Sequence, residues 1–137
     1  MKEADGIIFG SPVHFSDIGA TMKSFLDRAI YVGSANNGLY RHKVGAGVVA
    51  VRRAGGMQAF SQLNNYIAYS EMIMPTSNYW NIVFGLKPGE AVKDDEGIQT
   101  MRVLGKNMAW LMKLVELGDG KIEKPEPERK AFTNLVK

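Results

Sequence analysis

The 137-residue chain is 45% hydrophobic with a formal net charge of +3, as expected for one globular domain. It contains no cysteine, which excludes disulfides, thiolate metal sites and a cysteine nucleophile within this sequence. Basic residues are scattered and no apolar run is long enough to cross a bilayer, so we expect neither nucleic acid nor a membrane as partner. Without an apolar leader-like segment, a cytoplasmic location is the default expectation.

The first predicted element is a buried strand followed by a tight loop. Residues 7–9, Ile-Ile-Phe, form an apolar run typical of a strand. Pro12 lacks a backbone N–H, so we expect the strand to end there and Val13, His14 and Phe15 to be presented on a loop. In open α/β sheets, ligands bind at this end of a strand.

A helix and a second strand are predicted next. Apolar residues at helical spacing indicate a helix that begins near Asp17, is capped by Ser16 or Asp17, and ends near Gly33. Residues 44–51 are small and apolar throughout, which is typical of a strand covered on both faces of a parallel sheet.

A glycine-containing loop follows this strand and opens a helix over residues 57–67. Gly55 and Gly56 would expose N–H groups at the positive end of the helix dipole, which favours an anion. Arg52 and Arg53 add positive charge beside them. From these residues alone, an anion site and a solvated basic turn are equally good interpretations.

Residues 71–75 predict a third strand with a proline at its exit, and residues 82–84 a further short extended run. Trp80, in the loop between them, either covers a pocket or fills core space. Asp94, Asp95 and Glu96 then place negative charge at the start of a long amphipathic helix that ends near Gly118.

Two stretches of this sequence resemble the flavin-loop signature of the flavodoxin-like NAD(P)H-dependent FMN reductases, most closely the WrbA-type quinone reductases and the iron–sulfur flavoproteins. They are Gly10-Ser11-Pro12-Val13-His14-Phe15 and Met22-Lys23-Ser24-Phe25-Leu26-Asp27-Arg28. The alternative interpretation is an ordinary strand–helix turn of another doubly wound protein. The resemblance extends through Tyr79-Trp80-Asn81 and Gly85.

The resemblance implies that the first loop lies against the isoalloxazine ring of FMN and that the glycine loop lies beside the flavin and its reductant. The implied cofactor-binding residues are Ser11, Pro12, Val13, His14, Phe15, Arg53, Ala54, Gly55, Gly56 and Trp80. No catalytic or metal-binding residue is predicted, since the flavin carries the hydride. His14 either tunes the flavin or quinone site or is a plain loop histidine.

The predicted fold class is α/β: the C-terminal part of a flavodoxin-like fold, with a parallel sheet of about three strands and helices on both faces. Residues 1–118 would form this partial domain. In the family an earlier Ser/Thr/Asn-rich loop holds the FMN phosphate, and nothing before Asp5 can play that part. The cysteines of the iron–sulfur subgroup are also missing, so no cluster is expected.

Two functions from different classes fit these features. The first is an FMN-dependent oxidoreductase that passes reducing equivalents from NAD(P)H to a quinone or other small acceptor. The second is a flavin-free homologue that acts as a structural or partner-binding subunit. Residues 7–9 would leave an apolar open edge, which predicts a homo-oligomer, most simply a two-fold dimer. The tail, residues 119–137, is expected to dock on its own or a partner subunit through Phe132, Leu135 and Val136.

Overall fold

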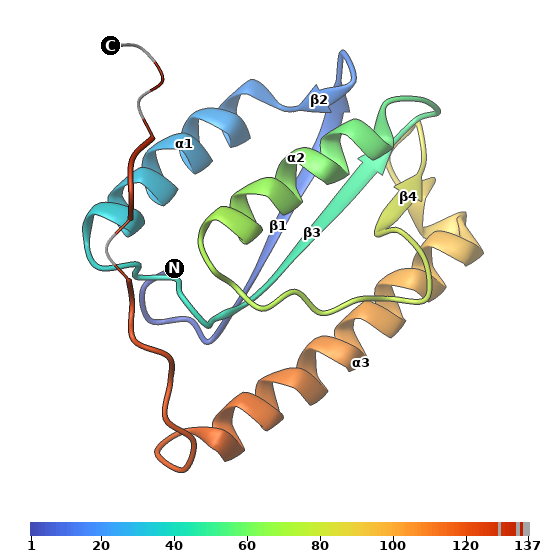
Figure 1. The fold of residues 1–137 in the computed structure, drawn as a ribbon. Coiled ribbons are helices and arrows are strands. Elements are labelled where there is room, and N and C mark those ends of the chain that lie inside the picture. The colour runs from blue at the N-terminus through green and yellow to red at the C-terminus, as the bar shows by residue number, and fades with distance from the viewer. Residues whose placement is uncertain (129, 134, 136–137) are drawn as a thin grey trace.

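The computed structural model describes residues 1–128, 130–133 and 135. It is an α/β fold whose sheet has the strand order β2-β1-β3-β4 (Figure 1). Strands β1, β3 and β4 are parallel, and β2 pairs antiparallel with the end of β1. In chain order the elements are β1 (Gly6–His14), β2 (Asp17–Ile18), α1 (Ala20–Ala35), β3 (Val44–Val51), α2 (Gly56–Tyr69), β4 (Ile82–Phe84), the 3-10 helix η1 (Ala91–Lys93) and α3 (Asp95–Gly118).

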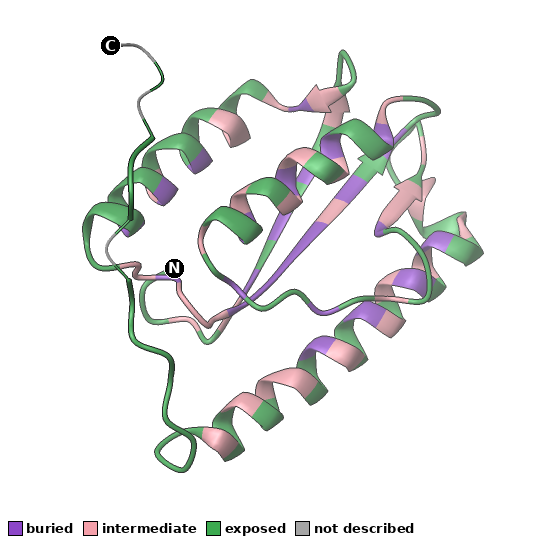
Figure 2. Cartoon of the chain, in the orientation of Figure 1, coloured by how far each residue is buried: buried purple, intermediate pink, exposed green. Residues whose placement is uncertain are grey.

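Helices cover both faces of the sheet, as the fold class predicted. Side chains alternate along β3, so Val49 and Val51 pack against α1 and α2 while Val44 and Ala46 pack against α3. The larger core joins Leu26 of α1 with buried residues of α2 and β1, and buried residues concentrate along β1 and β3 (Figure 2). In the described part of the chain, no helix has the length and apolarity to span a bilayer.

The prediction that Pro12 ends the first strand is wrong, because β1 runs through Pro12 to His14. The Val44 N–H donates to the Asp5 carbonyl (3.1 Å), so odd-numbered residues of β1 direct their backbone groups toward β3 and even-numbered ones direct them outward. The donor that Pro12 lacks would therefore point away from β3, where an edge strand tolerates proline. Val13 and His14 thus belong to the strand rather than to a loop.

The expected third strand at residues 71–75 is also corrected. Only Ile73 forms a bridge, with Val44, and β4 takes the place of the third parallel strand. The Ile73 N–H donates to the Lys43 carbonyl (2.9 Å), and the Ile73 carbonyl accepts from the Gly45 N–H (3.0 Å). The next donor toward β3 would be the N–H of residue 75, but Pro75 has none, so the ladder stops after one bridge.

The first helix begins later than predicted and lacks the expected cap. α1 starts at Ala20, and its N-cap Gly19 makes no side-chain capping bond. The Asp17 carboxylate instead accepts from the neighbouring Ile18 N–H (2.7 Å). Ser16 and Asp17, which were predicted to cap the helix, therefore belong to the β1–β2 hairpin.

The start of α3 matches its prediction. Asp94 is its N-cap, and the carboxylate accepts from the N–H of Gly97 (3.0 Å) and from the N–H of Phe84 at the end of β4 (2.7 Å). A side chain at Gly97 would collide with this carboxylate. One side chain thus joins α3 to the last strand of the sheet.

The tail follows the surface of its own chain for part of its length (Figure 1). Arg41 donates to the Pro125 carbonyl (2.8 Å), and the Lys130 ammonium lies 5.4 Å from the ring centre of Tyr69. Phe132 and Leu135 are nonetheless exposed, and Val136 lies outside the described residues. Docking of these apolar side chains on a partner subunit stays a prediction.

The outer edge of β1 is open along most of its length. Within the described residues, β2 covers it only at Val13 and His14. Ile8 lies on the face opposite α1 and α2 and is 53% exposed. An apolar side chain beside unpaired strand groups is a template for association.

Replacing Asp94 with alanine should lower the free energy of unfolding by about 1–2 kcal/mol, because two backbone donors lose their acceptor. Urea denaturation measures the change. Asp95→Ala is the matched control and should cost at most about 0.5 kcal/mol, since Asp95 acts only through the helix dipole. Equal effects of the two substitutions would contradict the capping role of Asp94.

Candidate functional site

The two loops singled out by the sequence lie side by side at the carboxyl ends of β1 and β3, as predicted. Gly55 is the point of contact: a Cβ built on it would lie 2.8 Å from Ser16 Cα and 3.0 Å from Val13 Cγ1. Its φ is +86°, a conformation that disfavours any other residue. A side chain at position 55 would therefore both strain its own backbone and push the two loops apart.

The first loop is a two-residue hairpin turn between β1 and β2. Phe15 and Ser16 both have positive φ, 50° and 62°, the pattern of a type I′ turn that normally selects asparagine or glycine. Phe15 is fully exposed at the tip. An aromatic ring held in solvent on a left-handed backbone has no packing role within the described chain, and such strain concentrates at ligand sites.

Ser11 positions this hairpin. Its side chain is 4% exposed, donates to the Pro12 carbonyl (2.8 Å) and accepts from the N–H of Gly19 at the start of α1 (3.0 Å). The hydroxyl is thus already engaged within the chain. Pro12 and His14, by contrast, are exposed on the open face of β1.

The second loop supplies backbone donors and charge. Arg53 and Ala54 are exposed, whereas Gly56 is buried at the start of α2, where a Cβ would lie 3.2 Å from Ile82 and Val51. The N-cap Gly55 provides no side-chain acceptor, so the first N–H groups of α2 are open to an anionic or carbonyl atom.

Trp80 lies apart from these loops. It is about half exposed and lines two cavities, one beside the first half of β3 and one between α2 and the start of α3. Neither cavity is lined by any residue of the two loops, residues 11–16 and 53–55. The structure therefore gathers nine of the ten predicted residues at one rim and places Trp80 elsewhere.

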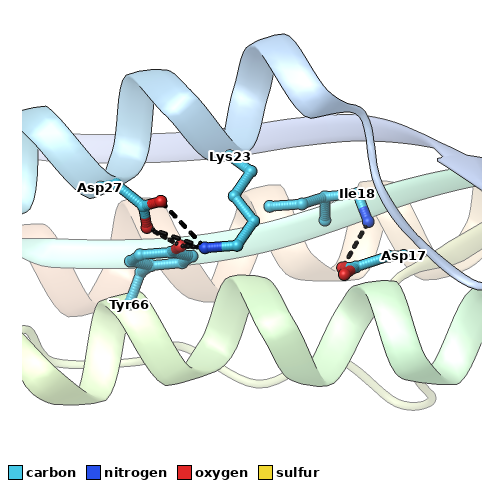
Figure 3. A network of polar contacts seen from close by, with 5 residues as sticks. All are labelled: Asp17, Ile18, Lys23, Asp27 and Tyr66. Carbon is cyan, nitrogen blue, oxygen red and sulfur yellow. Dashed lines mark hydrogen bonds and ion pairs between the residues drawn. The ribbon is translucent and has the colours of Figure 1, made fainter.

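A polar network that the sequence did not predict connects α1 with α2 (Figure 3). The Tyr66 hydroxyl donates to Asp27, and the Lys23 ammonium donates to Asp27 Oδ2 (2.9 Å) and to the Tyr66 oxygen (3.0 Å). Lys23 and Asp27 both belong to the flavin-loop signature. Their i, i+4 spacing is a local signal that places them on one helix face, but a contact between them was not predicted. Tyr66 lies 39 residues after Asp27, and only the fold brings it to them.

The network shifts the pKa values of all three groups. Hydrogen bonds from Tyr66 and Lys23 lower the pKa of Asp27 below its ordinary value of 3.8. Bonds to Tyr66 and Asp27 raise the pKa of Lys23, and burial raises that of Tyr66. The three groups thus stay in their bonded ionisation states around neutral pH. Among the described residues, no group of three or more His, Cys, Asp or Glu side chains could hold a metal ion.

The fold and the paired loops define a flavodoxin-like α/β protein. A WrbA-like protein of Agrobacterium tumefaciens superposes with a TM-score of 0.62 at 17% identity, covering 85% of this chain and 69% of that one. A flavodoxin from the domain Archaea gives 0.60 at 21% identity, covering 82% and 68%. At these identities the likeness concerns the fold alone.

Sequence comparison identifies the family. The family model for NADPH-dependent FMN reductase matches residues 1–87, so the chain belongs to this family. An iron–sulfur flavoprotein of Methanocaldococcus jannaschii is 38% identical over 125 residues, which are 85% of this chain and 63% of that protein. An iron–sulfur flavoprotein of Archaeoglobus fulgidus is 28% identical over 80% of this chain and 47% of its own length. The chain thus spans less than two thirds of these relatives.

Tyr66→Phe should lower the melting temperature by a few degrees, because the Asp27 carboxylate loses the hydrogen bond from the Tyr66 hydroxyl. Since the folded pKa of Asp27 lies below 3.8, its contribution is present above that pH and is lost as the pH falls through the folded value. The difference between wild type and variant should therefore shrink in acid. Tyr69→Phe, an exposed tyrosine on the same helix, is the control. If the difference in melting temperature stayed the same in acid, the stabilising role of the ionised Asp27 carboxylate would be contradicted.

Proposed function

We propose that this chain forms the ring-binding side of a cytoplasmic FMN-dependent oxidoreductase that passes reducing equivalents from NAD(P)H to a quinone or other small acceptor. The observation that carries the proposal is the juxtaposition of the exposed Phe15 hairpin with Gly55 at the N-terminus of α2. Membership of the FMN reductase family supports it.

The residues at the rim fit the ring of FMN. Phe15, Pro12 and His14 offer an apolar and aromatic surface, and the open N–H groups of α2 with Arg53 suit the electron-rich atoms of a flavin. The chemistry that FMN supplies when bound is hydride and electron transfer. The part of this chain is to bind and orient the ring, and the glycine at position 55 keeps the two loops close enough to do so together.

The open edge of β1 favours a second role, as a partner-binding subunit. Along β1, the backbone groups that point away from β3 pair with no described strand until Val13 and His14 meet β2. The side chain of Ile8 is exposed beside them. We propose that a second copy of the chain covers this edge as a two-fold dimer, since an antiparallel pairing of two identical edges is self-complementary. This role does not depend on flavin.

FMN titration followed by quenching of flavin fluorescence tests the first role. Wild type should bind FMN, and Phe15→Ala should weaken binding about tenfold because the ring loses a stacking surface. Phe132→Ala, which also removes an exposed phenylalanine, should leave the affinity unchanged. Oxidation of NADPH or NADH by the flavin-loaded protein, with a water-soluble quinone as acceptor, then tests the donor and acceptor. A colourless protein without affinity for FMN would leave only the partner-binding role.

Sedimentation velocity at micromolar concentration tests the dimer. Wild type should sediment as a dimer, and Ile8→Lys should shift it to monomer because the charge would be buried at the paired edge. Val32→Lys is the control, since Val32 on α1 is exposed to the same extent (52% against 53%). A wild-type monomer would contradict the proposal.

A further inference from the structure

The cavity beside the first half of β3, far along the sheet from the rim, lies where the chain between α2 and β4 leaves β3. Gly45 N–H donates to the Ile73 carbonyl (3.0 Å), and Val49 N–H donates to the Asn81 carbonyl (2.9 Å). Between these two contacts, residues 74–80 swing away from β3. They line one side of an open cavity of about 480 Å³, a size typical of small-molecule sites.

The edge of β3 presents to this cavity two backbone groups that no other described residue pairs with. Gly45 and Gly47 both direct their backbone groups toward the β4 side of the strand. In a continuous ladder, residue 75 would donate to the Gly45 carbonyl and accept from the Gly47 N–H. Pro75 has no N–H, and the register resumes only at Val49, opposite Ile82. The strand edge thus offers an acceptor and a donor side by side.

Asn81 adds a buried acceptor. Its side chain lines the cavity and the residue is 5% exposed. The Nδ2–H donates to the Gly47 carbonyl (3.1 Å), which fixes the orientation of the amide, and no described residue donates to Oδ1. A buried carbonyl oxygen without a donor is unfavourable, so this atom calls for a donor from a ligand or a water.

The walls of the cavity suit a flat, uncharged molecule. Phe60, Tyr79 and Trp80 provide aromatic surface, with the Tyr79 and Trp80 ring centres 4.5 Å apart, and the residues that line this cavity include no charged side chain. The loop is also held in place from outside. Ser77 Oγ–H donates to the Thr100 carbonyl and Asn107 Nδ2–H to the Thr76 carbonyl, both at 2.7 Å.

We propose that this cavity binds a neutral planar ring that carries an amide or lactam group. Its N–H would donate to Asn81 Oδ1, its C=O would accept from the Gly47 N–H, and its ring would lie among the aromatic side chains. A charged ligand would find no counter-charge there. The site shares no residue with the rim loops and does not depend on flavin binding.

Three probes with the same ring test the chemistry: benzamide, benzoate and methyl benzoate. Binding is followed by the fluorescence of Trp80 in a Trp110→Phe background, since these are the two tryptophans of the chain. Benzamide should saturate the signal and bind about tenfold more tightly than methyl benzoate, which lacks the N–H, and than benzoate, which is charged. Equal binding of all three, or no saturable binding of benzamide, would mean that the cavity holds water only and would overturn the proposal.

Two variants locate the site. Asn81→Ala should abolish the preference for benzamide over methyl benzoate. Pro75→Ala restores the missing N–H, so residue 75 can close the ladder on Gly45, and benzamide binding should weaken at least about threefold. Asn107→Ala is the control, because it loosens the same loop from outside the cavity. If Asn81→Ala does not fold, Pro75→Ala decides, and unchanged benzamide binding in that variant would contradict the proposal.

Discussion

The parallel pairing of β1 with β3 is the constraint on which the rest of the structure depends. Seven residue pairs, from Gly6 with Val44 to Pro12 with Ala50, fix the register of the two strands. Because the strands are parallel and in this register, the hairpin after β1 and the glycine loop after β3 meet at one rim. Gly55 can then approach Ser16 closely, and the open end of α2 comes to lie beside the hairpin that carries the exposed Phe15 at its tip.

The same pairing gives the two strands different surroundings. β3 is interior, with α2 on one face and α3 on the other, while β1 has an open edge and an exposed Ile8. A parallel sheet is usually covered on both faces and paired along its interior strands. The relatives that match this chain are longer than it. The dimer proposed above is one way to satisfy that edge.

Much of the site followed from the sequence because strand, glycine loop and helix have local signals. The strand at residues 44–51 and the negative charge at the start of α3 were predicted with their physical reasons, whereas the capping bond of Asp94 came from the structure. Proline had opposite outcomes that no local pattern distinguishes. Pro12 is tolerated because its nitrogen faces an open edge, whereas Pro75 ends a ladder because the next bond to β3 would need an N–H at its position. The direction in which a backbone nitrogen points is a property of the register, which sequence periodicity does not specify.

The side chains that connect distant segments were beyond local prediction for a related reason. Tyr66 joins Lys23 and Asp27, and the Ser11 hydroxyl holds Gly19, only because packing brings separate elements together. The signature that indicated a flavin loop therefore contains two kinds of residue. Some face the rim, and others, such as Lys23 and Asp27, hold α1 against α2 and keep the rim in place.

The central claim is that the hairpin and the glycine loop form one flavin-binding face. Amide chemical-shift mapping by NMR during addition of FMN tests it most directly. The account predicts that the largest shifts cluster at residues 13–16 and 54–57, on two segments that are adjacent only in the folded sheet. Shifts centred on residues 74–81, or absent from either rim loop, would contradict it.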